Sequence, residues 1–305
     1  MSPKQSQFEA DRVEEEEKKL GIGVNRALYR ELTFDLNNQN PKVLIRGEEV
    51  NGNNTLGMWF RVAGTKSGKY TEGRNLAIRL LQKEIFCANH EGYLKWERMG
   101  KISQHAVFIE NEIPVVATRI YYTKKQIKSP ELLRKMGAWE FPVISKHDRG
   151  YQGKSVRKFD SWKEEEEWVD RIEEKNLGCF LWQKYLPSRW DIRVIVIAGK
   201  AIGAMKRSPQ RRDEFRSNYS LGGKVERWEL DNTERNLAER VARVCGLDYC
   251  GIDMMYRSKS KDQKSKRKGN PYVLEVNRQC QFQGFEKATG INVAKKTVDM
   301  FWEKG

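Results

Sequence analysis

Two strand-like segments near the C-terminus constrain this chain more than any other feature. Residues 249–256 and 271–277 alternate apolar and polar side chains, and residues 259–268 between them include six lysines and arginines. A charge run of this kind is typical of a solvated surface loop. The pattern therefore predicts two neighbouring antiparallel strands joined by a long basic connection.

Strand alternation brings carboxylates together on one face of this hairpin. Glu275 and Asn277 lie two residues apart and share a face with Val273, whereas Leu274 faces the opposite way. If the strands pair, Asp253 joins Glu275 and Asn277. Oxygen donors without nitrogen or sulfur suit Mg²⁺. Geometry alone leaves the alternative open that these are ordinary polar residues on a solvent-facing surface.

The rest of the second half predicts antiparallel strands covered by helices. Strands are indicated at 141–146, 179–186, 192–198 and 201–206, and helices at 161–175, 237–244 and 293–302. Ser161 begins the first helix, where Glu164 completes a capping box, and Gly246 ends the second. The expected fold class is α+β, with antiparallel hairpins covered by helices.

The first half predicts a small α/β domain behind an extension. Residues 1–40 form an acidic and polar segment, in which Glu14–Glu17 indicates an exposed, peripheral helix. Residues 41–118 predict the α/β domain, with strands at 43–46 and 113–117 and a helix at 76–86. A central lobe at 119–186 and a C-terminal lobe at 187–305 complete the expected organisation.

The composition narrows the function classes. Five widely spaced cysteines without a C-x-x-C pair, and three histidines, argue against a zinc site or a disulfide framework. No apolar stretch reaches the roughly 18–20 residues of a membrane span, and the N-terminus lacks the order of a secretory signal, so we expect a cytoplasmic protein. The net charge of +15 predicts an anionic partner. Nucleic acid is disfavoured because no stacking motif or docking helix is evident.

Basic and glycine-containing segments surround the carboxylate hairpin in the sequence. Lys146 ends a predicted strand, and residues 148–155 follow with glycines that permit close approach to phosphate but without P-loop spacing. Three arginines follow: Arg193 just before an apolar strand, Arg207 at the end of the next strand, and Arg216 in a loop that ends at Gly222 and Gly223. Each alone would be a solvated charge, and together they suit a transferring phosphoryl group.

Several motifs of the second half occur in a fixed order. They read FPVISK, GYQG, WQKYL, WDIRVIVIAGKAIGAMKR, EFRSNYSLGG, LDYCGIDMMY, YVLEVN and GFEKATGIN. In this order they resemble the RimK-like ATP-grasp ligases, the family that adds glutamate to a ribosomal protein tail. The resemblance covers about residues 141–301. It implies the ATP-grasp fold, with ATP held between two lobes.

The resemblance also implies roles for individual residues. The adenine would lie at the hinge and the ribose beside it, and the remaining residues would contact the phosphates. The residues that would bind the nucleotide are Lys146, Gln152, Gly153, Lys184, Tyr185, Asp191, Arg216, Ser217 and Asn218. The metal, two Mg²⁺ ions with Mn²⁺ as an alternative, would bind Asp253, Glu275 and Asn277. Arg193, Arg207 and Arg216 would neutralise charge during catalysis.

The implied reaction is ATP-dependent peptide-bond formation through an acyl phosphate. The substrates would be an amino acid, a peptide or a protein tail, acidic in character; a homo-oligomer is left open. The sequence departs from the family at Lys184, which replaces an acid at the adenine hinge, and at residues 278–283, which replace a Ser-Pro-Gly turn. These departures keep an alternative open, a non-catalytic basic protein that binds nucleotide or nucleic acid on an ATP-grasp scaffold.

Overall fold

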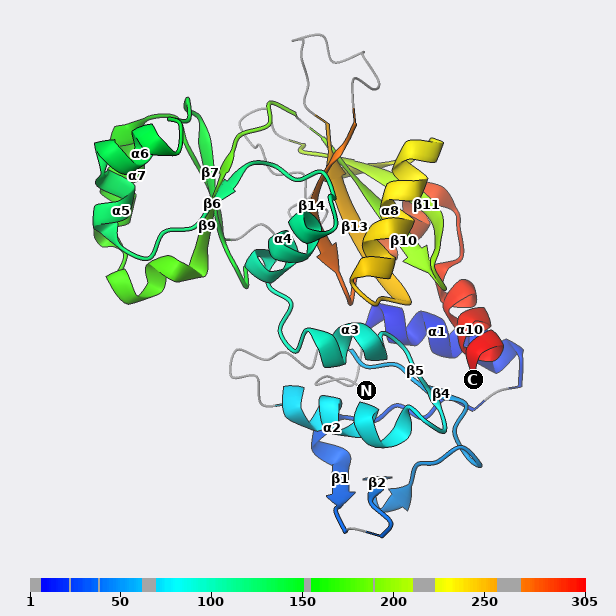
Figure 1. Cartoon of the computed structure of the whole chain (residues 1–305). Coiled ribbons are helices and arrows are strands. Elements are labelled where there is room, and N and C mark those ends of the chain that lie inside the picture. Colours follow the sequence, from blue (N-terminus) through cyan, green and yellow to red (C-terminus); the bar gives the residue numbers. More distant parts are fainter. Residues whose placement is uncertain are drawn as a thin grey trace.

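The protein is described from a computed structural model (Figure 1). The structure describes residues 7–21, 23–37, 39–61, 70–150, 155–188, 190–210, 223–256 and 270–305. Three parts follow one another: an N-terminal domain, a small central lobe and a larger C-terminal lobe.

A five-stranded antiparallel sheet forms the C-terminal lobe. Its strand order is β12-β11-β10-β13-β14. The strands are β10 Asp191–Ile197, β11 Lys200–Ser208, β12 Lys224–Trp228, β13 Tyr249–Met255 and β14 Tyr272–Asn277. The predicted pairing of the C-terminal hairpin is confirmed, because Asp253 lies directly opposite Glu275 and Gly251 opposite Asn277.

The first hairpin of this sheet turns at Ala198 and Gly199. Both residues have positive φ, 50° and 75°, so the two-residue turn has the twist that antiparallel strands prefer. The predicted pairing of 192–198 with 201–206 is therefore confirmed, but the turn lies one residue earlier than predicted, because Ala198 belongs to it and Lys200 begins β11.

Helices cover both faces of the sheet. On one face α8 (Asn232–Val244) and α4 (Lys101–Glu110) bury the even-numbered residues of β10 and β13, among them Val194 and Ile252. On the other face α9 (Gln283–Thr289) and α10 (Val293–Lys304) bury residues such as Ile195 and Tyr249. Helix α8 begins with a capping box at Asp231 and ends before Gly246, as predicted for its C-terminus.

The central lobe is a four-stranded antiparallel sheet with order β6-β9-β7-β8. Its strands are β6 Thr118–Arg119, β7 Val143–His147, β8 Val156–Phe159 and β9 Phe180–Lys184, and its helices are α5 Lys124–Lys128, α6 Pro130–Lys135, α7 Trp162–Arg171 and the 3-10 helix η2 Glu174–Cys179. Ser161 caps α7, but the reciprocal bond of Glu164 goes to the backbone of Asp160. The helix also ends earlier than residue 175, because Ile172 takes an extended backbone.

The N-terminal domain is a small mixed structure. It contains η1 Tyr29–Glu31, the sheet of β1 Leu32–Asp35, β2 Lys42–Ile45 and β3 Glu48–Glu49, the parallel pair β4 Gly57–Met58 and β5 Phe86–Cys87, and helices α2 Thr71–Leu81 and α3 His90–Lys95. The predicted helix at 76–86 ends at Leu81, because Phe86 and Cys87 pair with β4. The predicted strand at 113–117 is wrong: Pro114 has no N–H for a ladder, and only Val115 forms an isolated bridge.

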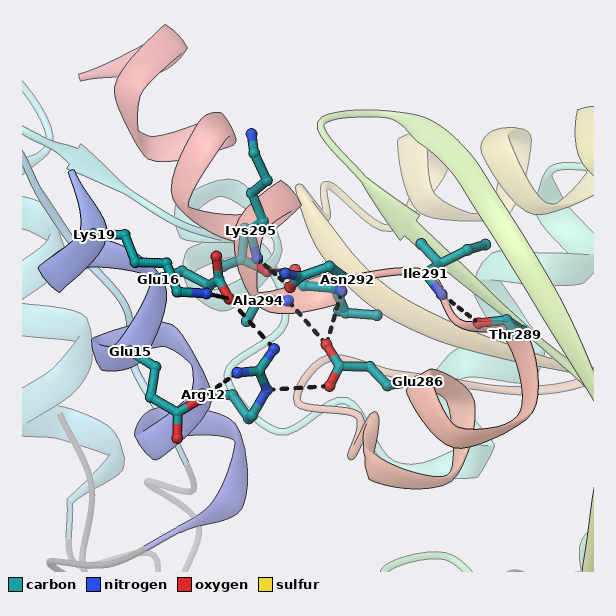
Figure 2. Close-up of polar contacts among 12 residues, drawn as sticks. Arg12, Glu15, Glu16, Lys19, Glu286, Thr289, Ile291, Asn292, Ala294 and Lys295 are labelled. Carbon is teal, nitrogen blue, oxygen red and sulfur yellow. Dashed lines mark hydrogen bonds and ion pairs between the residues drawn. The ribbon is translucent and has the colours of Figure 1, made fainter.

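The N-terminal helix α1 (Phe8–Lys19) is not peripheral, contrary to expectation. It lies beside α10 (Figure 1), and Val13 contributes to the core under α9 and α10. Figure 2 shows Arg12 donating to Glu286. The other oxygen of Glu286 accepts the N–H of Val293, at the start of α10, at 2.8 Å. Residues from both ends of the chain therefore share one packed layer.

Within the described part of the chain, no helix has the length and apolarity that a membrane crossing requires.

Candidate active site

A cleft lies between the central and C-terminal sheets. Its lining residues come from β7, β8, β9, β10, β11, β13 and β14, from the start of α4, and from the segments that connect the elements: Lys101, Val116, Ile144, Lys146, His147, Gly150, Ser155, Val156, Gln183, Lys184, Tyr185, Leu186, Ser188, Asp191, Arg207, Asp253, Met255, Leu274 and Glu275. The lining combines apolar side chains, such as Ile144, Val156 and Leu274, with charged side chains from both sheets. Such a surface suits a ligand with an apolar ring and a charged tail.

The charged side is built on a buried network of four side chains. Asp253 lies opposite Arg193 in the sheet, and its two oxygens accept from Nε and Nη2 of Arg193 at 2.7 Å each. Arg207 Nη2 lies 3.0 Å from the same carboxylate, and its Nε donates to Asp191 at 2.5 Å. Asp253 and Arg207 are each 3% exposed. Two carboxylates and two guanidiniums balance in charge, as buried ions must.

The network fixes the charge state of its members. Burial acts against the charged form of Asp253, but Arg193 and Arg207 outweigh it and hold the pKa of this carboxyl well below its usual range. Burial likewise opposes the charge of Arg207, and Asp191 and Asp253 raise its pKa above the ordinary value. Asp253 and Arg207 are therefore ionised at neutral pH.

Strand β14 brings Glu275 to the cleft beside this network. Glu275 Oε2 lies 3.4 Å from Lys101 Nζ, and its Oε1 accepts from Asn277 Nδ2 at 3.2 Å. The predicted alternation of side chains does not hold throughout this strand. The register shifts at Leu274, which lines the cleft, while Val273 is buried in the core under α8. The bulge reverses both side chains relative to strict alternation.

Helix α4 holds the outer edge of β14 in place. The side chain of Gln104 accepts the N–H of Val276 at 2.9 Å and donates to the carbonyl of Val276 at 3.0 Å. It therefore satisfies backbone groups at the edge of the sheet that would otherwise pair with a neighbouring strand. Lys101 also donates to the carbonyl of Gly150 at 2.7 Å. Sequence reasoning missed both α4 residues, because the motifs used for the resemblance begin at Phe141.

Lys146 lies across the cleft from the carboxylates, on β7. Burial lowers its pKa to about 8, Glu275 acts in the opposite direction, and the charge of Lys101 adds to the lowering. The position is therefore electropositive and poorly solvated, and it would be stabilised by an anionic ligand. This is the environment in which a phosphate contact is expected.

Gln183 and the residues after it form the hinge side of the cleft. Gln183 donates to Thr118 at 2.8 Å and faces Nε2 of His105, whose Nδ1 is 3.1 Å from the carbonyl of Lys101. Burial lowers the pKa of His105, so this ring is neutral. The next residue, Lys184, is exposed and donates its backbone N–H to Ala117. Sequence reasoning did not single out Gln183 or His105.

Of the predicted site residues, the structure brings eight to or beside the cleft: Lys146, Lys184, Tyr185, Asp191, Arg193, Arg207, Asp253 and Glu275. Asn277 follows at the end of β14, in contact with Glu275. The other predicted contacts, Gln152, Gly153, Arg216, Ser217 and Asn218, lie outside the described residues, as does the basic tract at 259–268.

The donor set can be tested against a divalent cation. Among the residues that the structure describes, no three His, Cys, Asp or Glu side chains converge on one point. Glu275 and Asn277 nevertheless offer oxygen donors side by side, and Mg²⁺ commonly uses one or two carboxylates with waters and phosphates. Both oxygens of Asp253 accept from arginines, yet a carboxylate has about four lone-pair sites and can accept further partners. The chemistry fits Mg²⁺.

Comparison with known proteins matches this architecture. A family model described as the RimK-like ATP-grasp domain matches residues 99–301. The chain belongs to the RimK-like ATP-grasp family. The match begins at Met99, so it includes α4 and its Lys101 and Gln104, which the sequence motifs did not reach.

Two relatives of this RimK-like chain carry the name "Probable alpha-L-glutamate ligase". One, from Rhodopirellula baltica, is 30% identical over 72% of this chain and 50% of its own length. The other, from Aeromonas salmonicida, is 33% identical over 67% of this chain and 62% of its own length. The chain thus spans between half and two thirds of these relatives.

A solved structure shows the same fold at low identity. The ATP-grasp ligase PsnB, complexed with a phosphomimetic variant of its minimal precursor, Mg and ADP, superposes with a TM-score of 0.73 at 19% identity. The alignment covers 99% of this chain and 96% of that one, so the N-terminal domain is part of the shared fold.

Proposed function

We propose that this protein is an ATP-dependent ligase that joins a carboxylate to an amine through an acyl phosphate. The observation that carries the proposal is the cleft between two antiparallel sheets, with Lys146 on one wall and the Asp191–Arg207–Asp253–Arg193 network and Glu275 on the other. The names of the relatives and the ADP and Mg complex of PsnB support it.

The nucleotide would lie along this cleft. The adenine would contact Tyr185 and the backbone at Lys184, Asp191 would lie near the ribose, and Lys146 would contact the phosphates. Backbone N–H groups at Gln152 and Gly153, and the side chains of Arg216, Ser217 and Asn218, would complete the phosphate site.

Asp253, Glu275 and Asn277 would hold Mg²⁺, two ions in the family pattern. When bound, the metal would neutralise the charge that develops on the phosphate oxygens. The chain's own guanidiniums supply the same kind of stabilisation: Arg193 and Arg207 are fixed by Asp253, so little reorganisation is needed as charge develops.

The reaction would proceed in two displacements. A substrate carboxylate oxygen attacks the γ-phosphorus, the bond to the β-phosphate oxygen breaks, and ADP leaves. The amine nitrogen then attacks the acyl carbon, the carbon–oxygen bond to phosphate breaks, and phosphate and the nitrogen-bound proton are released. Closure of the cleft around the acyl phosphate would exclude water, which would otherwise hydrolyse it.

The substrate class follows from charge. The +15 net charge favours an acidic amino acid, peptide or protein tail over a neutral one. Incubation with ATP, Mg²⁺ and pools of amino acids and acidic peptides should release phosphate and add a defined mass to one pool member. If ATP is not bound and no pool stimulates phosphate release, the proposed function is wrong.

A further inference from the structure

The turn after β14 folds back against the neighbouring strand β13. It begins at Arg278, the first residue of the segment that replaces the family turn, and leads to Cys280. The hydroxyl of Tyr249 on β13 donates to the carbonyl of Cys280 at 2.9 Å. A Cβ atom at Gly251 would lie only 2.7 Å from the Cβ of Cys280, so the turn occupies space that only a glycine leaves open. The turn is therefore packed closely on β13.

The side chain of Arg278 connects this turn to α3 in the N-terminal domain. Its Nη1 donates to the carbonyl of Trp96 at 2.7 Å and to that of Gly92 at 3.3 Å, and its Cζ lies 4.9 Å from the ring centroid of Tyr93. Burial lowers the pKa of Arg278 to about 10, so the guanidinium stays charged at neutral pH. A cation is favourable at the C-terminal end of a helix, where carbonyls lack helical partners and carry partial negative charge. Arg278 thus joins the end of β14 to the end of α3.

The main chain of the turn is held by the same part of the N-terminal domain. Asn89, the residue before α3, donates from Nδ2 to the carbonyls of Arg278 at 3.1 Å and of Tyr249 at 2.8 Å. Its Oδ1 accepts the N–H of Tyr249 at 2.8 Å. Gln279 donates to the hydroxyl of Tyr93 at 2.9 Å. The segment that contains α3 therefore holds both the backbone and the side chains of the turn, and it precedes the residues that the family model matches.

This anchorage comes directly after the proposed metal ligand Asn277. Strand β14 is at the edge of its sheet, and Asn277 is its last residue, opposite Gly251. The end of an edge strand opens locally at little cost in free energy unless other contacts hold it. The carboxamide of Asn277 donates to Glu275 at 3.2 Å, so a shift of the strand end would change the spacing of two proposed ligands. Mg²⁺ demands near-ideal octahedral geometry, which leaves little room for such a shift.

We propose that Arg278 is a positioning residue for the metal site. Its contacts with α3 fix the main chain that follows Asn277 and thereby place the Asn277 carboxamide beside Glu275. The inference rests on the proposed function in taking Asp253, Glu275 and Asn277 as the metal ligands. Arg278 would act through Asn277 and would not contact the metal. The N-terminal domain would thus contribute to the metal site through α3.

The test compares Arg278→Met with the matched control Arg74→Met. Both substitutions remove a guanidinium that packs on the ring of Tyr93 and donates to a backbone carbonyl. Arg74 belongs to α2 and is not adjacent to a proposed metal ligand, so R74M controls for the loss of packing and of a buried cation. Arg278→Lys is a second variant, which keeps the positive charge but loses the planar fork of donors.

The measurement is Mn²⁺ binding to the full chain. Electron paramagnetic resonance counts the unbound Mn²⁺ during a titration in which the protein is in excess over ADP. Calorimetry with EDTA present gives the metal-free affinity for ADP, which should be the same in every variant and shows that the cleft is folded. Phosphate release from the pools of amino acids and acidic peptides is followed in parallel.

The dissociation constant of Mn²⁺ should rise by roughly tenfold to a hundredfold in R278M, as for other losses of a group that orients a metal ligand. It should rise less in R278K and stay at the wild-type value in R74M. The proposal is overturned if R278M with normal ADP affinity binds Mn²⁺ like the wild type, if R74M weakens Mn²⁺ binding as much as R278M, or if wild type with ADP binds no more Mn²⁺ than ADP alone. Should R278M not fold, R278K decides: a raised dissociation constant supports the positioning role, and a wild-type value refutes it.

The same data separate this role from the proposed ligase activity. Weaker Mn²⁺ binding in R278M, with no wild-type turnover of ATP on any substrate, would retain the positioning role and refute the ligase. Wild-type turnover together with unchanged Mn²⁺ affinity in R278M would retain the ligase and refute the positioning role.

Discussion

The two ends of one face of the C-terminal sheet differ in what covers them. Along β10, Arg193 lies at the charged end, and Ile195 and Ile197 follow on the same face with a spacing of two residues. Helices α9 and α10 cover the apolar end, whereas the cleft and the central lobe face the charged end. The strands are continuous, so the position of the site depends on where the covering helices stop.

Burial has a different energetic consequence at the two ends of this face. At the apolar end, burial excludes water and stabilises the fold through contact area. At the charged end, the same burial is tolerated only because Asp253 and the two arginines pair with ideal geometry. A substitution at one end should therefore have a different signature from one at the other.

The largest difference is expected between Asp253→Asn and Ile195→Ala. D253N leaves two buried guanidiniums without their common carboxylate, so it should lower the free energy of unfolding by about 3–5 kcal/mol and kcat by roughly a hundredfold to a thousandfold. I195A should cost about 2–5 kcal/mol of stability and leave kcat of the folded fraction unchanged. Urea unfolding and ATP-dependent phosphate release measure both. Equal effects of the two substitutions on kcat would contradict the assignment of catalysis to the charged end and of stability to the apolar end.

A smaller effect is expected for Glu275→Gln, which removes a charge from the proposed metal position without changing its shape. The Mg²⁺ concentration for half-maximal activity should rise by at least roughly tenfold. Glu226→Gln, on the opposite edge strand β12 of the same sheet, is the matched control. If E275Q requires the same Mg²⁺ concentration as the wild type, Glu275 is not a metal ligand.

The pH dependence of nucleotide affinity should report on Lys146. Because its pKa is lowered to about 8, the ammonium loses its proton as pH rises through this value, whereas an ordinary lysine stays charged to about 10.5. ATP affinity should fall by up to about tenfold per pH unit above this pKa. In Lys146→Gln the affinity should be weaker and flat between pH 7 and roughly 9.5. A flat profile in the wild type would show that Lys146 does not contact the phosphates.

The smallest effect is expected at the hinge. Lys184 is exposed, and its replacement by glutamate should restore an acceptor for the adenine amino group. One such hydrogen bond contributes about 0.5–1.5 kcal/mol, so ATP should bind roughly twofold to tenfold more tightly while GTP affinity stays constant. An equal gain for both nucleotides would indicate a general effect of charge instead.

The sequence predicted the C-terminal lobe well because its strands are long and their periodicity is regular. The pairing of Asp253 with Glu275 followed from alternation and is confirmed. Alternation failed at Leu274, because a bulge inserts one residue that no local pattern reveals. The short strands β4 and β5 and the docking of α1 were also missed, since they depend on contacts distant in sequence.

The site residues that lie on the predicted strands could be identified from the sequence. Those contributed by other parts of the chain could not. Strand ends indicated Lys146, Arg193 and Arg207 as candidates. Lys101 and Gln104 could not be found in this way, because α4 reaches β14 only through the packing of the N-terminal half. Arg74 and Arg278 likewise meet at the ring of Tyr93 only in the folded chain.

The most direct test of the central claim follows oxygen from substrate to phosphate. The protein is incubated with Mg²⁺, ATP and a pool of amino acids and acidic peptides whose carboxylates carry ¹⁸O, and the released phosphate is analysed by mass spectrometry. Carboxylate activation through an acyl phosphate predicts one ¹⁸O atom in each phosphate released by the substrate-dependent reaction. Substrate-dependent ATP turnover that yields only unlabelled phosphate would contradict this account.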